Sequence, residues 1–191
     1  MLFQFMQMAY WLALSSWFGG VLFIAASVPI IFRTIRQSDP LIPTVLSVNL
    51  EGQHSTLLAN TIVGNLLAML FKFEIGCAIV LFVTVIAQWF TLDLRNENVK
   101  TFCAVRSLLL LTAIGVALYD SQVVWPRVQQ SRQEYLDNAD DPEIANPAID
   151  RFDRYHRDSV TLLSVLLFVL LGMILFSANI VPAAHPVVLT P

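Results

Sequence analysis

One carboxylate stands inside an otherwise apolar stretch of the chain, and it is the side chain best placed to do chemistry. Asp120 follows Tyr119 in the segment 107–125, which carries no other charge. An ionisable residue at membrane depth is costly and commonly marks an ion or proton path. Asp120 is therefore a functional candidate, with a purely structural ion pair or hydrogen bond as the alternative. The basic side chains available to it are Arg33, Lys72, Arg127 and His156.

A second group of polar residues follows the long acidic loop. Phe152, His156 and Ser159 fall on one helical face, because their spacings are four and three residues. Taken with the carboxylate, they predict one functional cluster near the cytoplasmic end of the membrane. Its members are Asp120, Tyr119, Arg127, His156 and Ser159.

Two histidines raise a different chemistry. If His54 and His156 converged inside a four-helix bundle, they could ligate a b-type haem or a metal. Neither lies deep in an apolar segment and neither belongs to a ligand-spaced motif. We therefore expect no metal and no cofactor, with b-type haem as the alternative. His185, in the proline-rich tail 182–191, is expected to be exposed.

Signatures of soluble enzymes and of nucleic-acid binding are missing from the sequence. It holds no G-x-S-x-G, no H-E-x-x-H, no phosphate-binding loop and no dinucleotide fingerprint, so no enzyme is expected. The net charge of -3 comes from an acidic loop, which gives nucleic acid no basic surface. Cys77 and Cys103 lie in or beside apolar segments and are interpreted as packing residues.

Four apolar stretches must position these side chains. A membrane-spanning helix takes roughly 20 mostly apolar residues, and spans are expected at about 8–32, 73–92, 107–125 and 159–181. The chain is 57% hydrophobic and 13% charged, with a mean hydropathy of +0.68. The sequence therefore predicts an all-α fold: one domain, 1–191, forming an integral membrane four-helix bundle in the lipid bilayer.

The basic residues predict the orientation of the bundle. The first stretch follows no Lys or Arg and exceeds a signal-peptide core, so we expect it to stay in the protein. Most basic residues flank the first and third connections, which the positive-inside rule places in the cytoplasm, with both termini outside. A bacterial inner membrane is the expected location. The side with the first and third connections holds Arg33, Arg36, Lys72, Arg127, Arg132, Arg151, Arg154 and Arg157. The side with the termini holds Arg95, Lys100 and Arg106.

The second helix and the third connection have distinctive features. No proline interrupts 56–90, which predicts one long second helix of roughly 50 Å with Lys72 and Glu74 at the cytoplasmic interface. The segment 126–158 is expected to be a cytoplasmic excursion interrupted by Pro142 and Pro147. Within it, 128–136 is expected to extend the third helix and 149–157 to begin the fourth.

Small and polar residues recur every four positions along the second helix, from Thr56 to Gly76. Such spacing lets helices approach closely in lipid. The first helix has two small residues at the same four-residue spacing, Ser16 and Gly20. The expected packing residues are Ser16, Gly20, Asn60, Gly64 and Gly76. Pro29 is expected to kink the first helix, and tryptophans near the helix ends to form an aromatic belt. These are Trp11, Trp89 and Trp125.

Three pieces in order carry a resemblance to a known family. They are Trp17-Phe18-Gly19-Gly20 followed by Pro29 and Phe32, then Tyr119 with Pro126-Arg127, then Phe152-x-x-x-His156-x-x-Ser159. This pattern resembles the transmembrane protein 205-like family, also catalogued as domain of unknown function 4149, over roughly 12–176. The architecture is more loosely similar to copper-resistance membrane proteins of the D type.

The resemblance implies a fold and a set of positions to test. Members are small four-helix membrane proteins without one established activity, although a eukaryotic member is connected with platinum-drug resistance. This chain differs in its polar stretch 38–53 and in its longer acidic third connection. The implied positions are Gly20, Pro29, Tyr119, Pro126, Arg127, Phe152, His156 and Ser159.

Three functions stay open on the sequence. The first is a non-enzymatic membrane protein that handles a small solute or metal ion at the predicted cluster, in which case a homodimer is expected. The second is an accessory or assembly subunit that packs on a larger membrane complex. The third is a b-haem electron carrier that uses His54 and His156.

Overall fold

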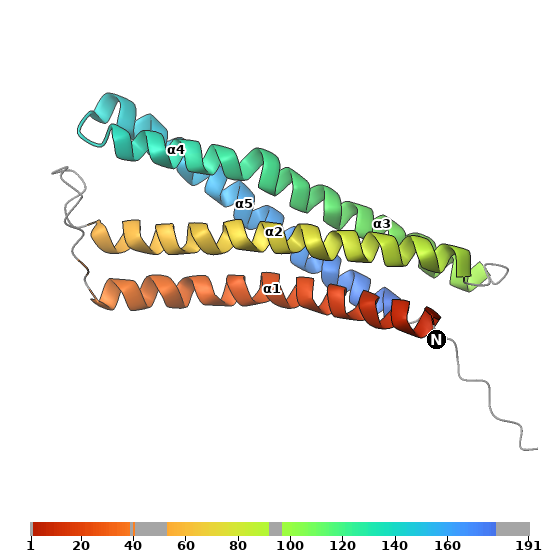
Figure 1. Ribbon diagram of the computed structural model, residues 1–191. Helices are drawn as coiled ribbons and strands as arrows, with labels where there is room; N and C mark the ends of the chain where they lie inside the picture. Colours follow the sequence, from red (N-terminus) through yellow and green to blue (C-terminus); the bar gives the residue numbers. More distant parts are fainter. Residues whose placement is uncertain (1, 39, 41–52, 92–96, 179–191) are drawn as a thin grey trace, which may run out of the picture.

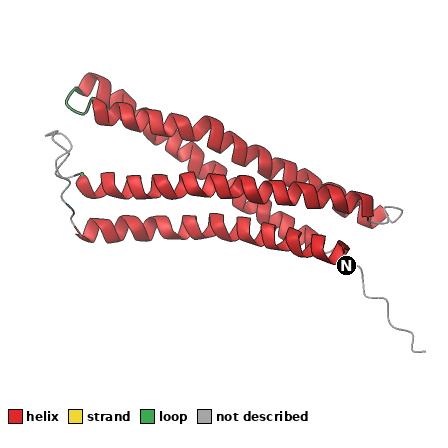
Figure 2. Cartoon of the chain, in the orientation of Figure 1, coloured by secondary structure: helices red, strands yellow, loops and turns green. Residues whose placement is uncertain are grey.

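The computed structural model describes residues 2–38, 40, 53–91 and 97–178, and these form helices without a strand (Figure 2). The elements in order are α1 (Leu2–Ser38), α2 (His54–Thr91), α3 (Glu97–Tyr119), a π-helical turn η2 (Asp120–Val124), α4 (Trp125–Asp137) and α5 (Pro142–Ala178). Most of the polar stretch, residues 39 and 41–52, and the tail with His185 lie outside the described residues.

The described helices form a four-helix bundle of long rods (Figure 1). α1 and α2 lie side by side as one pair, α3, η2 and α4 form a second rod, and α5 crosses behind α2. We call the end where α4 ends and α5 begins the α4 end, and the opposite end, where α1 begins, the N-terminal end. All four rods are long and apolar enough to cross a membrane. The predicted all-α four-helix fold is confirmed.

The second rod continues through Trp125 without a break. The Trp125 N–H donates to the Asp120 carbonyl oxygen, the bond that defines the π turn. Pro126 explains this turn, because it has no N–H and its ring crowds the carbonyl group four residues earlier. π turns of this kind often mark functional sites. The turn lies at the predicted carboxylate.

The loop between α4 and α5 is shorter than the sequence predicts. The predicted extension of the third helix is present as α4, but Pro142 begins α5 and does not interrupt the loop. The expectation for Pro147 is wrong, since it lies inside α5 near its first turns. There it removes one helical hydrogen bond, which the long helix tolerates.

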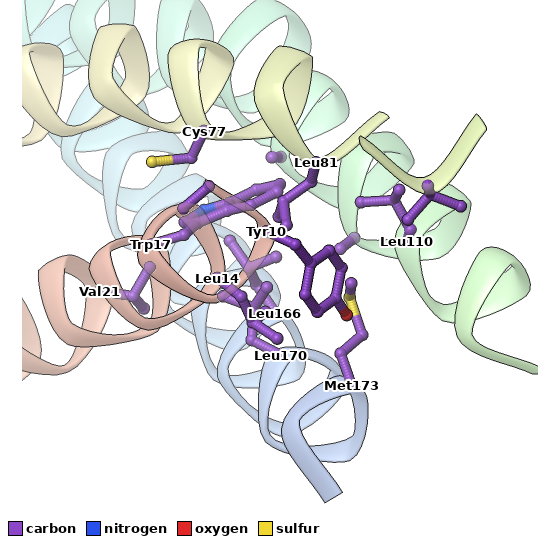
Figure 3. Packing of buried hydrophobic residues seen from close by; sticks show 14 residues of the cluster. Tyr10, Leu14, Trp17, Val21, Cys77, Leu81, Leu110, Leu166, Leu170 and Met173 are labelled. Atoms are coloured by element: carbon purple, nitrogen blue, oxygen red, sulfur yellow. The ribbon is translucent and has the colours of Figure 1, made fainter. Parts of the chain in front are cut away.

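The central core lies between α1, α2, α3 and α5 toward the N-terminal half of the bundle. Trp17 is fully buried beside Cys77 and Leu81 (Figure 3), and Leu14 contacts the same cluster. Burial recurs along each helix at three- and four-residue spacing, so each helix turns one stripe inward. Many large apolar side chains point outward instead, as on a bundle surrounded by lipid.

Candidate acidic site inside the bundle

Three charged side chains are buried in the described part of the bundle, and they form two separate groups. Glu74 is 2% exposed, Asp120 3% and Arg106 0%. Asp120 lies roughly 20 Å from Arg106 along the same rod, at 1.5 Å per residue. The two acids therefore lie together toward the α4 end, and the one buried arginine lies near the N-terminal end.

Asp120 is held by α5. The Ser159 hydroxyl donates a hydrogen bond of 3.2 Å to Asp120 Oδ2, while Asp120 Oδ1 is buried without a hydrogen-bond partner. Ser159 is itself buried. The structure thus brings together two members of the predicted cluster, and it leaves half of the carboxyl group unpaired.

Glu74 adds a second carboxyl group that the predicted cluster does not include. Its place at the membrane interface stays a prediction, but its burial was not expected: the side chain points into the bundle, where its charge interacts with that of Asp120. The indole N–H of Trp17 lies near the Glu74 carboxyl group. It is not in hydrogen-bond geometry, since Trp17 Nε1 and Glu74 Oε1 both lack a partner. We call Glu74 and Asp120 the acid pair.

No basic side chain compensates the acid pair among the described residues. The ion pair between Arg151 and Glu134, at 2.8 Å, lies at the α4 end and includes neither acid. Lys72 is exposed although it is only two residues from Glu74, since residues two apart lie on different faces of a helix. A buried carboxylate without a partner is strongly disfavoured. The acid pair therefore needs a proton, a bound cation or water.

Two hollows border the acid pair on different sides. Glu74 and Ser121 line a groove of about 340 Å³ between α2 and α3, which we call the α2–α3 groove. Ser159 lines a cavity of about 230 Å³ between α1, α2, α4 and α5, which we call the α4-side cavity. His156 lines this cavity as well, and its ring is exposed toward the α4 end.

The remaining members of the predicted cluster do not reach Asp120. Tyr119 is 51% exposed on the outside of the bundle. Arg127 lies over the Tyr155 ring, with its guanidinium carbon 5.8 Å from the ring centroid. His156 stacks on Phe152 at a centroid distance of 5.7 Å. The predicted cluster is therefore split: Ser159 contacts Asp120, whereas His156, three residues earlier on α5, lines the same α4-side cavity.

The haem alternative gains no geometric support from the described residues. His54 begins α2 and does not line the α4-side cavity, to which His156 belongs. No group of three or more His, Cys, Asp or Glu side chains in the described chain is arranged to hold a metal ion. Haem binding stays a prediction, and the absorption spectrum of the purified protein tests it.

The predicted packing residues divide into two kinds. A Cβ added at Gly20 would meet Phe73 at 3.3 Å, and one added at Gly64 would meet Trp125 at 3.7 Å, so both glycines lie at close helix contacts. Ser16 and Gly76 instead line an open groove of about 510 Å³ between α1 and α2. Asn60 is half-buried.

The buried arginine at the N-terminal end was also missed. Arg106 lies over the Tyr10 ring, with its guanidinium carbon 4.9 Å from the ring centroid, and its three nitrogens lack hydrogen-bond partners. The Tyr10 hydroxyl forms a hydrogen bond with Ser177. At the same end, Trp89 Nε1 donates to the Ser107 hydroxyl at 3.0 Å.

Comparison of the chain with protein-family models, with curated proteins and with solved structures finds no match in any of the three. The acid pair, its unpaired oxygens and the two hollows are therefore the observations on which a function must be argued.

Proposed function

We propose that this protein is a membrane carrier that exchanges protons for a second cation at the acid pair. The observation that carries the proposal is the burial of Glu74 and Asp120 together, without a basic partner among the described residues. Two interacting carboxylates buried in a low-dielectric interior are strongly disfavoured from both staying ionised without a compensating positive charge. The pair is thus suited to hold a cation that can be replaced by a proton.

The acid pair is not expected to stabilise the folded protein. Buried charges cost free energy, and apolar residues of similar volume commonly match or exceed the stability of a buried ionic group. Intramembrane acids without structural partners are accordingly candidates for proton or ion paths. Ser159 satisfies one oxygen of Asp120, but the free oxygens of both acids keep binding capacity.

Protons need a route to the pair, and the α4-side cavity supplies one. Its lining runs from exposed His156 to buried Ser159, which contacts Asp120 directly. The two ring nitrogens of an imidazole can accept and donate a proton. In this proposal a proton passes from the α4 end through the cavity, with water completing the chain between His156 and Ser159, to Asp120 and then Glu74.

Location and orientation belong to the same proposal. The basic residues gathered at the α4 end favour a cytoplasmic α4 end and outside termini in a bacterial inner membrane. Arg33, Arg36, Arg151 and Arg154 are among them. The resemblance to the transmembrane protein 205-like family agrees with a small four-helix membrane protein, and it assigns no activity.

Proton movement in liposomes tests the exchange. Wild-type protein, Glu74→Gln, Asp120→Asn and the exposed control Glu143→Gln are reconstituted at equal density around a trapped pH-sensitive dye. A pH gradient is imposed, and a panel of monovalent cations is then added outside. Wild type and Glu143→Gln are expected to show a cation-triggered pH change that both acid-pair variants lack. Equal responses from all four proteins would contradict the proposal.

An accessory subunit is the second candidate, and the open groove between α1 and α2 favours it. Ser16, Gly76 and Ala13 give this groove a small-residue lining against which a partner helix could pack closely. Gly76→Leu would fill it, because a Cβ at Gly76 meets nothing within 4 Å. Loss of a co-purifying protein in Gly76→Leu would support this function. Gly64→Leu does not test it, since Gly64 packs on Trp125 within the chain.

A further inference from the structure

The α2–α3 groove has an unusual combination of surfaces. Its walls are almost entirely apolar, and exposed side chains such as Ile79 and Leu111 form its rim. On a bundle that crosses a membrane this rim faces the acyl chains. A ligand of this groove would therefore reach it sideways, from within the bilayer.

The one charged residue in the lining of the groove is Glu74, a member of the acid pair. Glu74 belongs to the lining, is 98% buried as a residue, and keeps Oε1 without a hydrogen-bond partner. Ser121 adds one hydroxyl group, which donates to its own helix at the Leu118 carbonyl oxygen. α3 contributes no charged side chain to the lining.

We propose that the α2–α3 groove binds a lipophilic cation, an apolar molecule with a single positive charge, whose charge pairs with Glu74. This inference rests on the proposed function, for which it supplies the second cation. The apolar walls take up the body of the ligand, and burying it there contributes roughly 25 cal/mol per Å². The unpaired carboxyl group selects positive charge, and an anion of the same shape would meet repulsion.

Proton and ligand compete for the same group. When the cation pairs with the Glu74 carboxylate, the proton held by the pair leaves through Asp120 and Ser159 toward the α4-side cavity, and it returns when the cation leaves. The net charge of the acid pair with its bound proton or cation is the same in both states, because one positive charge replaces another. The groups that face Glu74 are Trp17 from α1, Asp120 from η2 and Cys77 on α2 itself. α5 contributes Ser159 through Asp120.

The matched ions tetraphenylphosphonium and tetraphenylborate test the groove. They share four phenyl rings and differ in the sign of their charge, and neither titrates. Binding to the full chain in lipid nanodiscs is measured by equilibrium dialysis, with protein-free nanodiscs subtracted. Wild type is expected to bind tetraphenylphosphonium saturably and tetraphenylborate only as lipid does. Acidification is expected to weaken the binding of tetraphenylphosphonium, up to about tenfold per pH unit for one competing proton.

Substitutions locate the site. Glu74→Gln and Ala78→Phe, which fills the groove without a change in charge, are each expected to weaken binding at least about tenfold. Glu143→Gln, which lies outside the groove, is the control. The wild-type pH dependence needs no substitution, so a variant that fails to fold does not remove the test.

Two outcomes would overturn the inference: equal saturable binding of both ions, or binding of the cation that neither acidification nor Ala78→Phe weakens. The proposed function fails separately. If tetraphenylphosphonium binds in a Glu74-dependent manner but displaces no proton in weakly buffered solution, the groove is a cation site without proton exchange. If the liposome assay shows exchange of other cations and tetraphenylphosphonium does not bind, the exchange stands and the groove assignment falls.

Discussion

Ser159 on α5 donates its hydroxyl to Asp120 Oδ2 at 3.2 Å, at the point where the second rod changes from α- to π-helical geometry. Both side chains are buried. This single contact joins the second rod to α5 beside the α4-side cavity. It therefore positions the carboxyl group on which the proposed proton path depends.

Removal of the Ser159 hydroxyl tests this contact. Ser159→Ala is expected to lower the free energy of unfolding by about 1–3 kcal/mol, because it leaves a second buried oxygen of Asp120 unpaired. Thermal unfolding in mild detergent measures the change. The control is Ser164→Ala on the same helix, whose exposed hydroxyl bonds only the Val160 carbonyl oxygen at 2.8 Å. Equal unfolding temperatures for both variants would show that the Ser159 contact contributes nothing.

Adjacent glycines test the packing of α1 on α2. A Cβ at Gly20 would meet Phe73 at 3.3 Å, whereas one at Gly19 meets nothing within 4 Å. Gly20→Val is expected to destabilise the bundle by about 1–3 kcal/mol through overpacking, and Gly19→Val to leave the unfolding temperature close to that of wild type. The account of this contact is wrong if Gly19→Val is the more damaging change.

Tyr10 carries two separable interactions at the N-terminal end. Tyr10→Phe keeps the ring under Arg106 and removes only the hydrogen bond to Ser177, at an expected cost of about 1 kcal/mol. Tyr10→Leu also removes the cation–π contact and is expected to cost about 0.5–2 kcal/mol more. Unfolding of the two variants, with exposed Tyr119→Phe as the control, measures the difference. A smaller loss in the leucine variant would contradict the contribution of Arg106.

The orientation is tested by labelling cysteines placed at the two ends. In a background with Cys77 and Cys103 replaced by alanine, Gln4→Cys marks the N-terminal end and Gln130→Cys the α4 end, since both positions are exposed. A membrane-impermeant maleimide added to intact spheroplasts is expected to label Gln4→Cys. Gln130→Cys is expected to react only after permeabilisation. The reverse pattern would invert the orientation.

The fold could be predicted from the sequence because the number and length of its apolar stretches determine it. A chain with four long apolar stretches must satisfy its backbone polar groups inside lipid, and helices do this within each segment. The long α2 followed from the absence of proline over 56–90, and the structure confirms it as His54–Thr91. The π turn did not follow, since a proline inside a helix is compatible with a kink, a break or a π turn.

The burial of Glu74 was missed although the sequence contains a signal for it. Glu74 is in phase with Cys77 and Leu81, which are buried on the same stripe of α2. The neighbouring charge of Lys72 suggested a membrane interface, and it concealed this periodicity. Arg106 was missed in the same way, because it is in phase with Cys103 and Leu110.

The predicted cluster around Asp120 was recovered only in part. Helical spacing correctly placed Ser159 and His156 on related turns of α5, and the structure brings Ser159 to Asp120. Spacing within one helix cannot give the rotation of one helix against another, which depends on how all the side chains pack. For this reason Tyr119 and Arg127 point away from the carboxyl group.

Proton binding by the acid pair is the most direct test of the proposed carrier. Wild-type protein and the double variant Glu74→Gln/Asp120→Asn, both in nanodiscs in weakly buffered solution, are titrated from about pH 8 to about pH 5, the range around carboxyl and imidazole titration. The account predicts that wild type takes up about one proton more than the double variant, since the pair shares a proton site. Titration curves that superimpose over this range would contradict it.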